Sequence, residues 1–307
     1  MRYKGKTFPE QSMDDKTVYA LGFFDGVHMG HQALLRECRR IADETGCKAA
    51  ALTFSSHPDA LVFGQAPALI NTVADRERLL RRFGMDRVVI LPFDRHMMTM
   101  PWQTFFHMLV KQYGAEGLVC GHDFRFGRAG EGSAAKLQTV CAETDIPCVV
   151  VPEQKIDGIT VSSTCIRSLL EAGEMERATR FLGHPHIISG TVVPGRHLGR
   201  TLGIPTANLV LPEALVRPMR GVYACKALVD GKTCLAVTNV GVRPTVDGGN
   251  VTVEPWILDF DGDLYGKALT LELYSFLRPE RKFPDLDALR REIQRNALQT
   301  RHFFENT

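Results

Sequence analysis

A change in the pattern of apolar residues, a little more than halfway along the chain, is the feature that most restricts its fold. Up to about residue 183, short apolar runs alternate with longer stretches of helical periodicity. Strand followed by helix, repeated, is typical of a parallel sheet with helices on both faces. We expect strands at 18–22, 49–54, 87–91, 117–120 and 148–151, and helices at 32–44, 74–83, 102–113 and 133–143.

Beyond residue 184, runs of β-branched and aromatic residues follow one another with only turns between them, at 187–193, 222–229, 233–239, 251–258 and 268–276. This pattern predicts an antiparallel sheet or small barrel. A closing helix is expected at 286–296, after Asp285, because its apolar residues are spaced i, i+3, i+7. The chain of 307 residues is therefore expected to form an α/β domain over 1–184 and a β-barrel domain over 185–307.

The charge balance argues against a nucleic-acid or anionic-membrane partner. Basic and acidic residues number 22 each before His184, and 15 and 13 after it. The first 16 residues lack the apolar centre of a signal peptide, and no run of about 18 apolar residues occurs. Eight scattered cysteines form no CxxC pair, which is typical of reduced thiols. We therefore expect a cytoplasmic protein.

The stretch LGFFDGVHMGHQALL, residues 21–35, joins the first strand to the first helix through Gly22, Gly26 and Gly30. Glycines let a backbone approach a phosphate closely, and a helix N-terminus offers unpaired N–H groups. His28 and His31 would add donors at the same anion. A metal pair or two surface histidines are the alternatives, but no third ligand is nearby, so the pattern favours a phosphate site.

A second segment, VSSTCIRSLL at 161–170, precedes another helical run. Its hydroxyl residues suit an N-cap, which is the simplest interpretation. Arg167 falls within the first helical turn, where a cation opposes the helix dipole, and this suggests an anionic ligand.

Together these segments, with GHDFRFG at 121–127, resemble the nucleotidyltransferase superfamily and, more closely, the FMN adenylyltransferase module of bacterial bifunctional riboflavin kinase/FAD synthetases. The resemblance implies a Rossmann-like fold in the first half. It implies His28, His31 and Arg167 as catalytic residues. For ATP it implies Gly22, Phe24, Gly26, Gly30, Ser163 and Thr164, and for the flavin Asp123, Phe124 and His57.

The second half resembles the riboflavin kinase of the same family, through GTVVPGRHLGRTLGIPTANL at 190–209, VTNVGVRPT at 237–245, LDFDGDLYG at 258–266 and FLRPERKF at 276–283. The resemblance implies a nucleotide flap of Gly195, Gly199 and Gly203. It implies that Thr206 and Asn208 bind ATP and Mg²⁺, although a turn after Pro205 would also explain them. It further implies Glu272 as the kinase base; the strand pattern alone favours a solvent-facing residue.

The implied reactions need different chemistry. A riboflavin hydroxyl must lose a proton as it attacks ATP, so the kinase site benefits from a carboxylate base. FMN already carries an anionic phosphate nucleophile, so its adenylation needs alignment and charge stabilisation only. The expected substrates are riboflavin, FMN and ATP, used by a monomer or weak homo-oligomer. An enzyme retaining only one activity and a non-catalytic flavin or nucleotide sensor are the alternatives.

Several residues have simpler interpretations or depart from the family. Asp123 is also explained by an Asx turn, Asp261 and Gly262 by a hairpin turn, and the arginines at 76, 78, 81 and 82 by a solvated helix face. Ser55-Ser56, Cys165 and Pro255-Trp256 depart from the family pattern. Proline is expected at a sheet edge, so the last departure predicts a rebuilt flavin side of the kinase pocket.

Overall fold

The first half of the chain forms a five-stranded parallel sheet. The computed structural model describes residues 16–194, 203–243 and 250–306. The strand order is β3-β2-β1-β4-β7, and every pairing in this sheet is parallel. The strands are β1 (Thr17–Leu21), β2 (Lys48–Phe54), β3 (Arg87–Leu91), β4 (Ala115–Gly121) and β7 (Cys148–Val151). The predicted α/β fold is confirmed.

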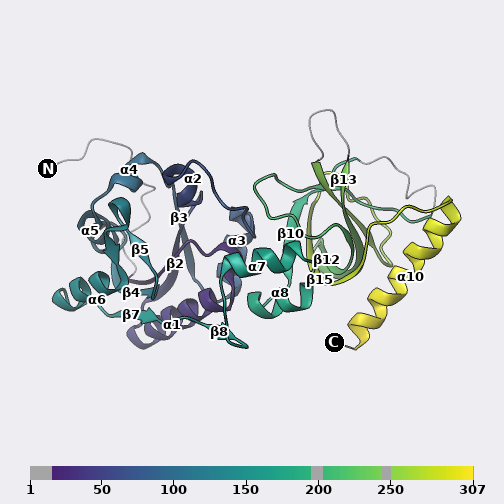
Figure 1. Ribbon diagram of the computed structural model, residues 1–307. Coiled ribbons are helices and arrows are strands. Elements are labelled where there is room, and N and C mark those ends of the chain that lie inside the picture. Colours follow the sequence, from purple (N-terminus) through teal and green to yellow (C-terminus); the bar gives the residue numbers. More distant parts are fainter. Residues whose placement is uncertain (1–15, 195–202, 244–249, 307) are drawn as a thin grey trace. The chain divides into compact units, whose positions relative to one another are not determined.

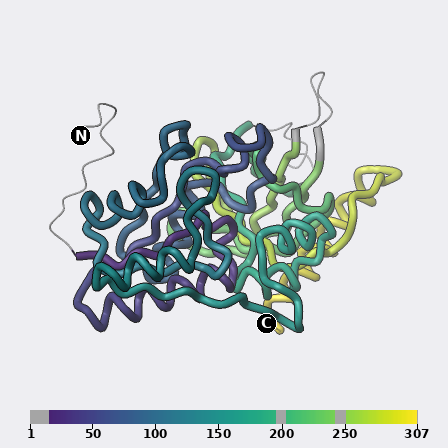
Figure 2. The backbone as a smooth tube through the Cα atoms, turned by 60° about the vertical axis from the view of Figure 1, so that its left-hand side comes forward, coloured from purple at the N-terminus to yellow at the C-terminus, as the bar shows by residue number. Residues whose placement is uncertain are grey.

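Helices cover both faces of this sheet because successive strand side chains point to opposite faces. Helix α1 (Met29–Thr45) packs along β1, β2 and β4, and lies along the lower side of the sheet in both views (Figure 1, Figure 2). On the other face, Tyr19 and Leu21 join the apolar cluster of α5 (Trp102–Gln112). The further helices are α2 (Pro58–Val62), α3 (Val73–Arg82), α4 (Arg95–Thr99) and α6 (Ala134–Glu143), with short strands β5 (Arg125–Phe126), β6 (Gly132–Ser133), β8 (Lys155–Ile156) and β9 (Ile159–Thr160).

The second half forms a six-stranded antiparallel barrel, as predicted. The order is β10-β15-β12-β13-β14-β11, and just beyond the two outer strands the backbone N–H of Val193, after β10, donates to the carbonyl of Asn208, before β11, at 2.9 Å. Leu269, Leu271 and Leu273 are buried on one face of β15. The strands are β10 (His186–Thr191), β11 (Leu209–Val210), β12 (Gly221–Val229), β13 (Lys232–Arg243), β14 (Asn250–Ile257) and β15 (Ala268–Pro279).

The closing helix α10 (Leu286–Glu305) begins where predicted but continues well beyond residue 296. Its N-cap is Asp285, whose Oδ1 accepts from the backbone N–H of Ala288 at 2.7 Å. The extra turns carry Phe304, whose ring meets that of Tyr274 edge-on at 5.0 Å. This contact with the barrel explains the longer helix, since packing stabilises turns that sequence pattern alone does not predict.

The chain divides into two compact units that do not follow the predicted boundary. The described residues up to 67 and those of 76–161 form one unit, and 68–75 and the residues from 162 onward form the other. The backbone of Leu69 bonds to Ala214 and Val216, which explains why 68–75 belong with the barrel. Helices α7 (Ser163–Glu171) and α8 (Met175–Leu182) belong there too. A functional boundary at 184/185 stays a prediction.

Within these described ranges, no helix has the length and apolar character needed to cross a membrane.

Candidate active sites

The loop after β1 lies at the switch point of the parallel sheet. Strand β1 is flanked by β2 on one side and by β4 on the other: the chain runs outward from β1 through β2 to β3 and then crosses back to β4, so the strand order reverses beside β1. In open parallel sheets, ligands bind outside the carboxyl ends of the strands at such a point. Residues 22–28, which lead from β1 into α1, occupy this position.

This loop has a strained backbone. Phe24, Gly26 and Val27 all adopt positive φ, at 59°, 81° and 41°. Two of them carry a Cβ, and such conformations cost about 1–3 kcal/mol each and are found mostly at functional sites. Phe24 is fully buried, and a Cβ on Gly22 would come within 3.1 Å of its ring. The local backbone therefore favours glycine at 22 and 26; their role in a phosphate loop stays a prediction.

His28 and His31 are brought together as a stacked pair. Their ring centroids lie 3.6 Å apart with an interplanar angle of 14°. His28 is the N-cap of α1, and its Nδ1 accepts from the backbone N–H of His31 at 3.2 Å. A neutral His28 therefore carries its proton on Nε2, where it can donate to a ligand. A Cβ on Gly30 would lie 3.1 Å from the His28 ring, so glycine leaves room for this stack.

The imidazole of His31 is held neutral. Burial, followed by the neighbouring His28 and Arg76, lowers the pKa of His31 well below its usual value. Two positive charges 3.6 Å apart would repel by about 5 kcal/mol at an effective dielectric of about 20. The pair therefore suits hydrogen-bond donation and does not suit two cations.

Arg76 is buried, which contradicts the prediction that it lies on a solvated helix face. Its side chain is 1% exposed, whereas Arg78, Arg81 and Arg82 on the same helix are exposed. The guanidinium donates to the carbonyl of Phe23 at 3.0 Å and to that of Phe54 at 2.5 Å. The sequence held a signal for this, because Arg76 shares the helix stripe of Leu79 and Leu80, spaced i, i+3, i+4.

The predicted flavin residues are only partly brought to the loop. His57 caps α2, accepting from the backbone N–H of Asp59 at 3.2 Å, and its ring meets that of Phe23 edge-on at 4.6 Å. Asp123 is exposed, with its carboxylate close to Gly121. Phe124 is half-buried and stacks on Phe126 at 5.5 Å. The departing residues Ser55 and Ser56 are exposed beside His57.

Ser162 is the N-cap of α7, which supports the simpler interpretation of the second segment. Its Oγ accepts from the backbone N–H of Cys165 at 3.2 Å, so this departing residue keeps a structural backbone bond. Ser163 and Thr164 begin the helix, and Arg167 donates to Thr164 Oγ1 at 3.1 Å. This helix belongs to the compact unit of the barrel.

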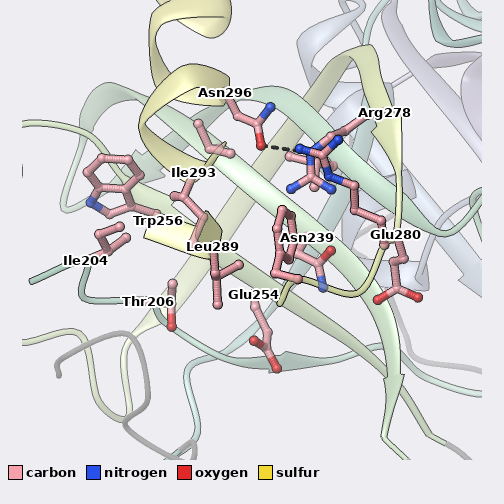
Figure 3. A pocket seen from close by; sticks show the side chains of 14 residues that line it. Ile204, Thr206, Asn239, Glu254, Trp256, Arg278, Glu280, Leu289, Ile293 and Asn296 are labelled. Atoms are coloured by element: carbon pink, nitrogen blue, oxygen red, sulfur yellow. Dashed lines mark hydrogen bonds between the residues drawn. The ribbon is translucent and has the colours of Figure 1, made fainter. Parts of the chain in front are cut away.

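The barrel contains two cavities that share Thr206. The first, about 340 Å³, has an apolar wall of Ile204, Trp256, Leu289 and Ile293, together with polar residues such as Asn239 and Glu254 (Figure 3). The second, about 640 Å³, is lined by Gly203, Thr206, Tyr265 and the acidic turn at 261–263. One cavity suits a flat apolar ring and the other a polar ligand, and Thr206 lies where they meet.

Glu272, the predicted base, lies elsewhere. Its Oε2 accepts from Tyr274 Oη at 2.9 Å, on the face of β15 opposite Leu271, and it lines neither cavity. Glu254 is the carboxylate that shares the first cavity with Thr206. The residues that follow Thr206 and Glu254 in the sequence are hydrogen-bonded to each other: the backbone N–H of Ala207 donates to the carbonyl of Pro255 at 2.9 Å. A base must reach the substrate hydroxyl, and this position favours Glu254.

The fit of a magnesium ion rests on few protein oxygens. Thr206 lines both cavities, while Asn208 is 7% exposed and lines neither. In the described ranges, no group of three or more His, Cys, Asp or Glu residues could hold a metal. Such a donor set fits Mg²⁺ held mainly by ATP phosphates and water. Gly195 and Gly199 lie outside the described residues.

Two predictions about turns and prolines were wrong. Asp261 and Gly262 do not form a hairpin, because the strands they connect, β14 and β15, are not neighbours. They line the second cavity. Pro255 lies within the inner strand β14, not at a sheet edge. Because its carbonyl faces Ala207, its nitrogen faces the same side, and β14 keeps its bonds to β13.

Comparisons with known proteins identify the family of each half of the chain. Residues 10–165 match the family model described as FAD synthetase, and residues 182–304 match the one described as riboflavin kinase. Proteins named bifunctional riboflavin kinase/FMN adenylyltransferase are 34% identical in Listeria monocytogenes, 36% in Escherichia coli and 32% in Bacillus subtilis. These alignments cover 95–96% of this chain and 93–95% of the relatives.

A solved structure described as a macrolide-efflux protein from Streptococcus pneumoniae is 31% identical, with a TM-score of 0.84, and the match covers 94% of both chains. The two domain matches and the near-complete coverage by relatives show that this chain belongs to the family of bifunctional riboflavin kinase/FMN adenylyltransferases.

Proposed function

We propose that the two activities of this family are carried out at separate sites of the chain, riboflavin phosphorylation in the barrel and FMN adenylation at the loop after β1. The observation that carries this division is a difference in side-chain chemistry. The barrel cavity offers a carboxylate, Glu254, beside Thr206, whereas the loop offers two stacked imidazoles. A hydroxyl nucleophile needs a base, and a phosphate nucleophile does not.

In the kinase reaction, the isoalloxazine ring of riboflavin lies against the apolar wall of the first cavity, and ATP occupies the second. The ribityl hydroxyl oxygen attacks the γ-phosphorus, its proton passes to Glu254, and the bond between the γ-phosphorus and the bridging oxygen of ADP breaks. The position of Thr206 at the junction of the two cavities supports this arrangement, because phosphoryl transfer requires both substrates to meet in line.

In the adenylation reaction, a phosphate oxygen of FMN attacks the α-phosphorus of ATP, and pyrophosphate leaves with the bridging oxygen. The negative charge shifts onto the leaving group, so stabilisation must come from hydrogen-bond donors. Nε2–H of His28 and the neutral ring of His31 supply them next to the N-terminus of α1. Arg167, Ser163 and Thr164 of α7 are proposed as further phosphate ligands.

Mg²⁺ bound to the ATP phosphates would neutralise part of their charge, with Thr206 as its protein ligand and Asn208 in support. A cytoplasmic location and a monomer or weak homo-oligomer remain proposals.

Labelled ATP tests the chemistry directly. The full chain is incubated with FMN and Mg²⁺ and with ATP labelled at either the α- or the γ-phosphorus. We expect the α label in FAD and the γ label only in pyrophosphate. With riboflavin as substrate, the γ label should enter FMN. A γ label in FAD made from unlabelled FMN would contradict the proposed adenylation.

A further inference from the structure

We propose that Arg76 is a positioning residue for FMN adenylation, which holds the loop of His28 and His31 against the edge of the parallel sheet. The inference rests on the proposed adenylation site. Arg76 touches no reacting atom in this scheme; it acts through the backbone of the loop.

The guanidinium joins two strand ends. One terminal nitrogen donates to the carbonyl of Phe23, just beyond β1, and the other donates to the carbonyl of Phe54, the last residue of β2. The planar group also lies 4.4 Å from the centroid of the Phe23 ring. Thr53 Oγ1 donates to the same Phe23 carbonyl at 2.7 Å. The peptide that follows Phe23 is therefore fixed by two donors.

The peptide after Phe23 is linked to the histidine pair by a chain of ring contacts that begins at Phe24. It leads into Phe24, which is fully buried with a φ of 59°. The ring of Phe24 meets the ring of His31 edge-on, with centroids 5.2 Å apart, and His31 stacks on His28. A shift of the Phe23 carbonyl would thus be passed to both imidazoles. The strained conformation needs such support, because it costs free energy by itself.

Burial of this charge has a second effect on the site. Desolvation lowers the pKa of Arg76 to about 10, opposed by the nearby Asp25, so the group stays charged at neutral pH. Asp25 is itself 3% exposed. The fixed positive charge disfavours a proton on His31 and keeps that ring a neutral donor. Burying a charge costs free energy, and the effect of Arg76 on the loop and on His31 explains why a charged residue is buried at this position.

Arginine is specifically suited to the position. Its rigid fork reaches two carbonyls at once while its face lies on an aromatic ring, and neither lysine nor glutamine can do all of this. Arg78 provides a matched control, because it is the same residue type on the same helix but exposed.

The test compares Arg76→Gln, Arg76→Lys and Arg78→Gln in the full chain. Both the kcat of FMN adenylation and the KM for ATP are measured, and riboflavin phosphorylation by the barrel serves as an internal check. We expect Arg76→Gln to lower the adenylation kcat by about tenfold to a hundredfold, with KM for ATP and the kinase rate little changed. Arg76→Lys should recover only part of kcat, and Arg78→Gln should match the wild type.

Equal adenylation rates for Arg76→Gln and Arg78→Gln would overturn the proposal. So would a change confined to KM, or a parallel loss of both activities in both Arg76 variants, which would assign Arg76 to general folding. A wild-type chain that forms no FAD from FMN would instead contradict the proposed adenylation site itself.

Discussion

Replacing Glu254 with Gln should abolish most of the riboflavin kinase activity while leaving FMN adenylation intact. The substitution keeps the shape of the side chain in the cavity next to Thr206 but removes its ability to take a proton. A positioned general base contributes about 10²- to 10⁴-fold to the rate, which corresponds to about 2.7–5.4 kcal/mol of activation free energy. We therefore expect the rate of FMN formation to fall by that factor.

The matched control is Glu272→Gln, in which the same chemical change is made outside both cavities. Glu272 accepts a hydrogen bond from Tyr274, and the amide oxygen of Gln can still accept it, so the substitution should cost at most about 1 kcal/mol of stability and leave both reaction rates unchanged. Both variants are assayed by chromatographic separation of FMN and FAD. A kinase rate that survives Glu254→Gln but collapses in Glu272→Gln would refute the assignment of the base.

Three further predictions follow from the geometry. His28→Ala or His31→Ala should each lower FMN adenylation by about 10²- to 10³-fold, as measured by FAD formation from FMN, with riboflavin phosphorylation unaffected; equal loss of both reactions would contradict separate sites. Thr206→Val should lower riboflavin phosphorylation by about 10- to 100-fold and raise its Mg²⁺ requirement, as seen in a magnesium titration, while FAD formation from FMN is unchanged. Burial lowers the folded-state pKa of His186 to about 3, so its contribution to stability is full above about pH 6.5 and is lost as the pH falls from there towards 3. At pH 5 the stability lost relative to neutral pH amounts to about 2 kcal/mol. Urea unfolding of the wild type and of His186→Gln should therefore show a weaker acid dependence of the unfolding free energy in the variant.

The architecture was predictable because each half repeats one periodicity. The alternation of expected strands and helices predicted the parallel sheet, and the succession of expected strands without helices between them predicted the barrel. The glycines and histidines of the first loop were predictable for a similar reason, since they follow the first strand directly. Local sequence was less informative where packing decides, as in the last turns of α10, which form against Tyr274.

Some candidate site residues could not be identified from the sequence, because their role depends on which face of a strand or helix is buried in the fold. Glu254 and Glu272 both alternate with apolar residues along a strand, and only the folded barrel shows which face lines a cavity. Arg76 was grouped with its exposed neighbours because charge runs usually mark a solvated face. Its spacing to Leu79 and Leu80 indicated the buried stripe, but no sequence rule supplied the two carbonyls that accept its hydrogen bonds.

Two variants mixed together test the central claim of separate sites most directly. Glu254→Gln alone, given riboflavin, ATP and Mg²⁺, should form little FMN or FAD, and His31→Ala alone should stop at FMN. The mixture should form FAD from riboflavin, because FMN released by one variant is adenylated by the other. A mixture that forms no FAD, although each variant retains its own reaction, would contradict the account.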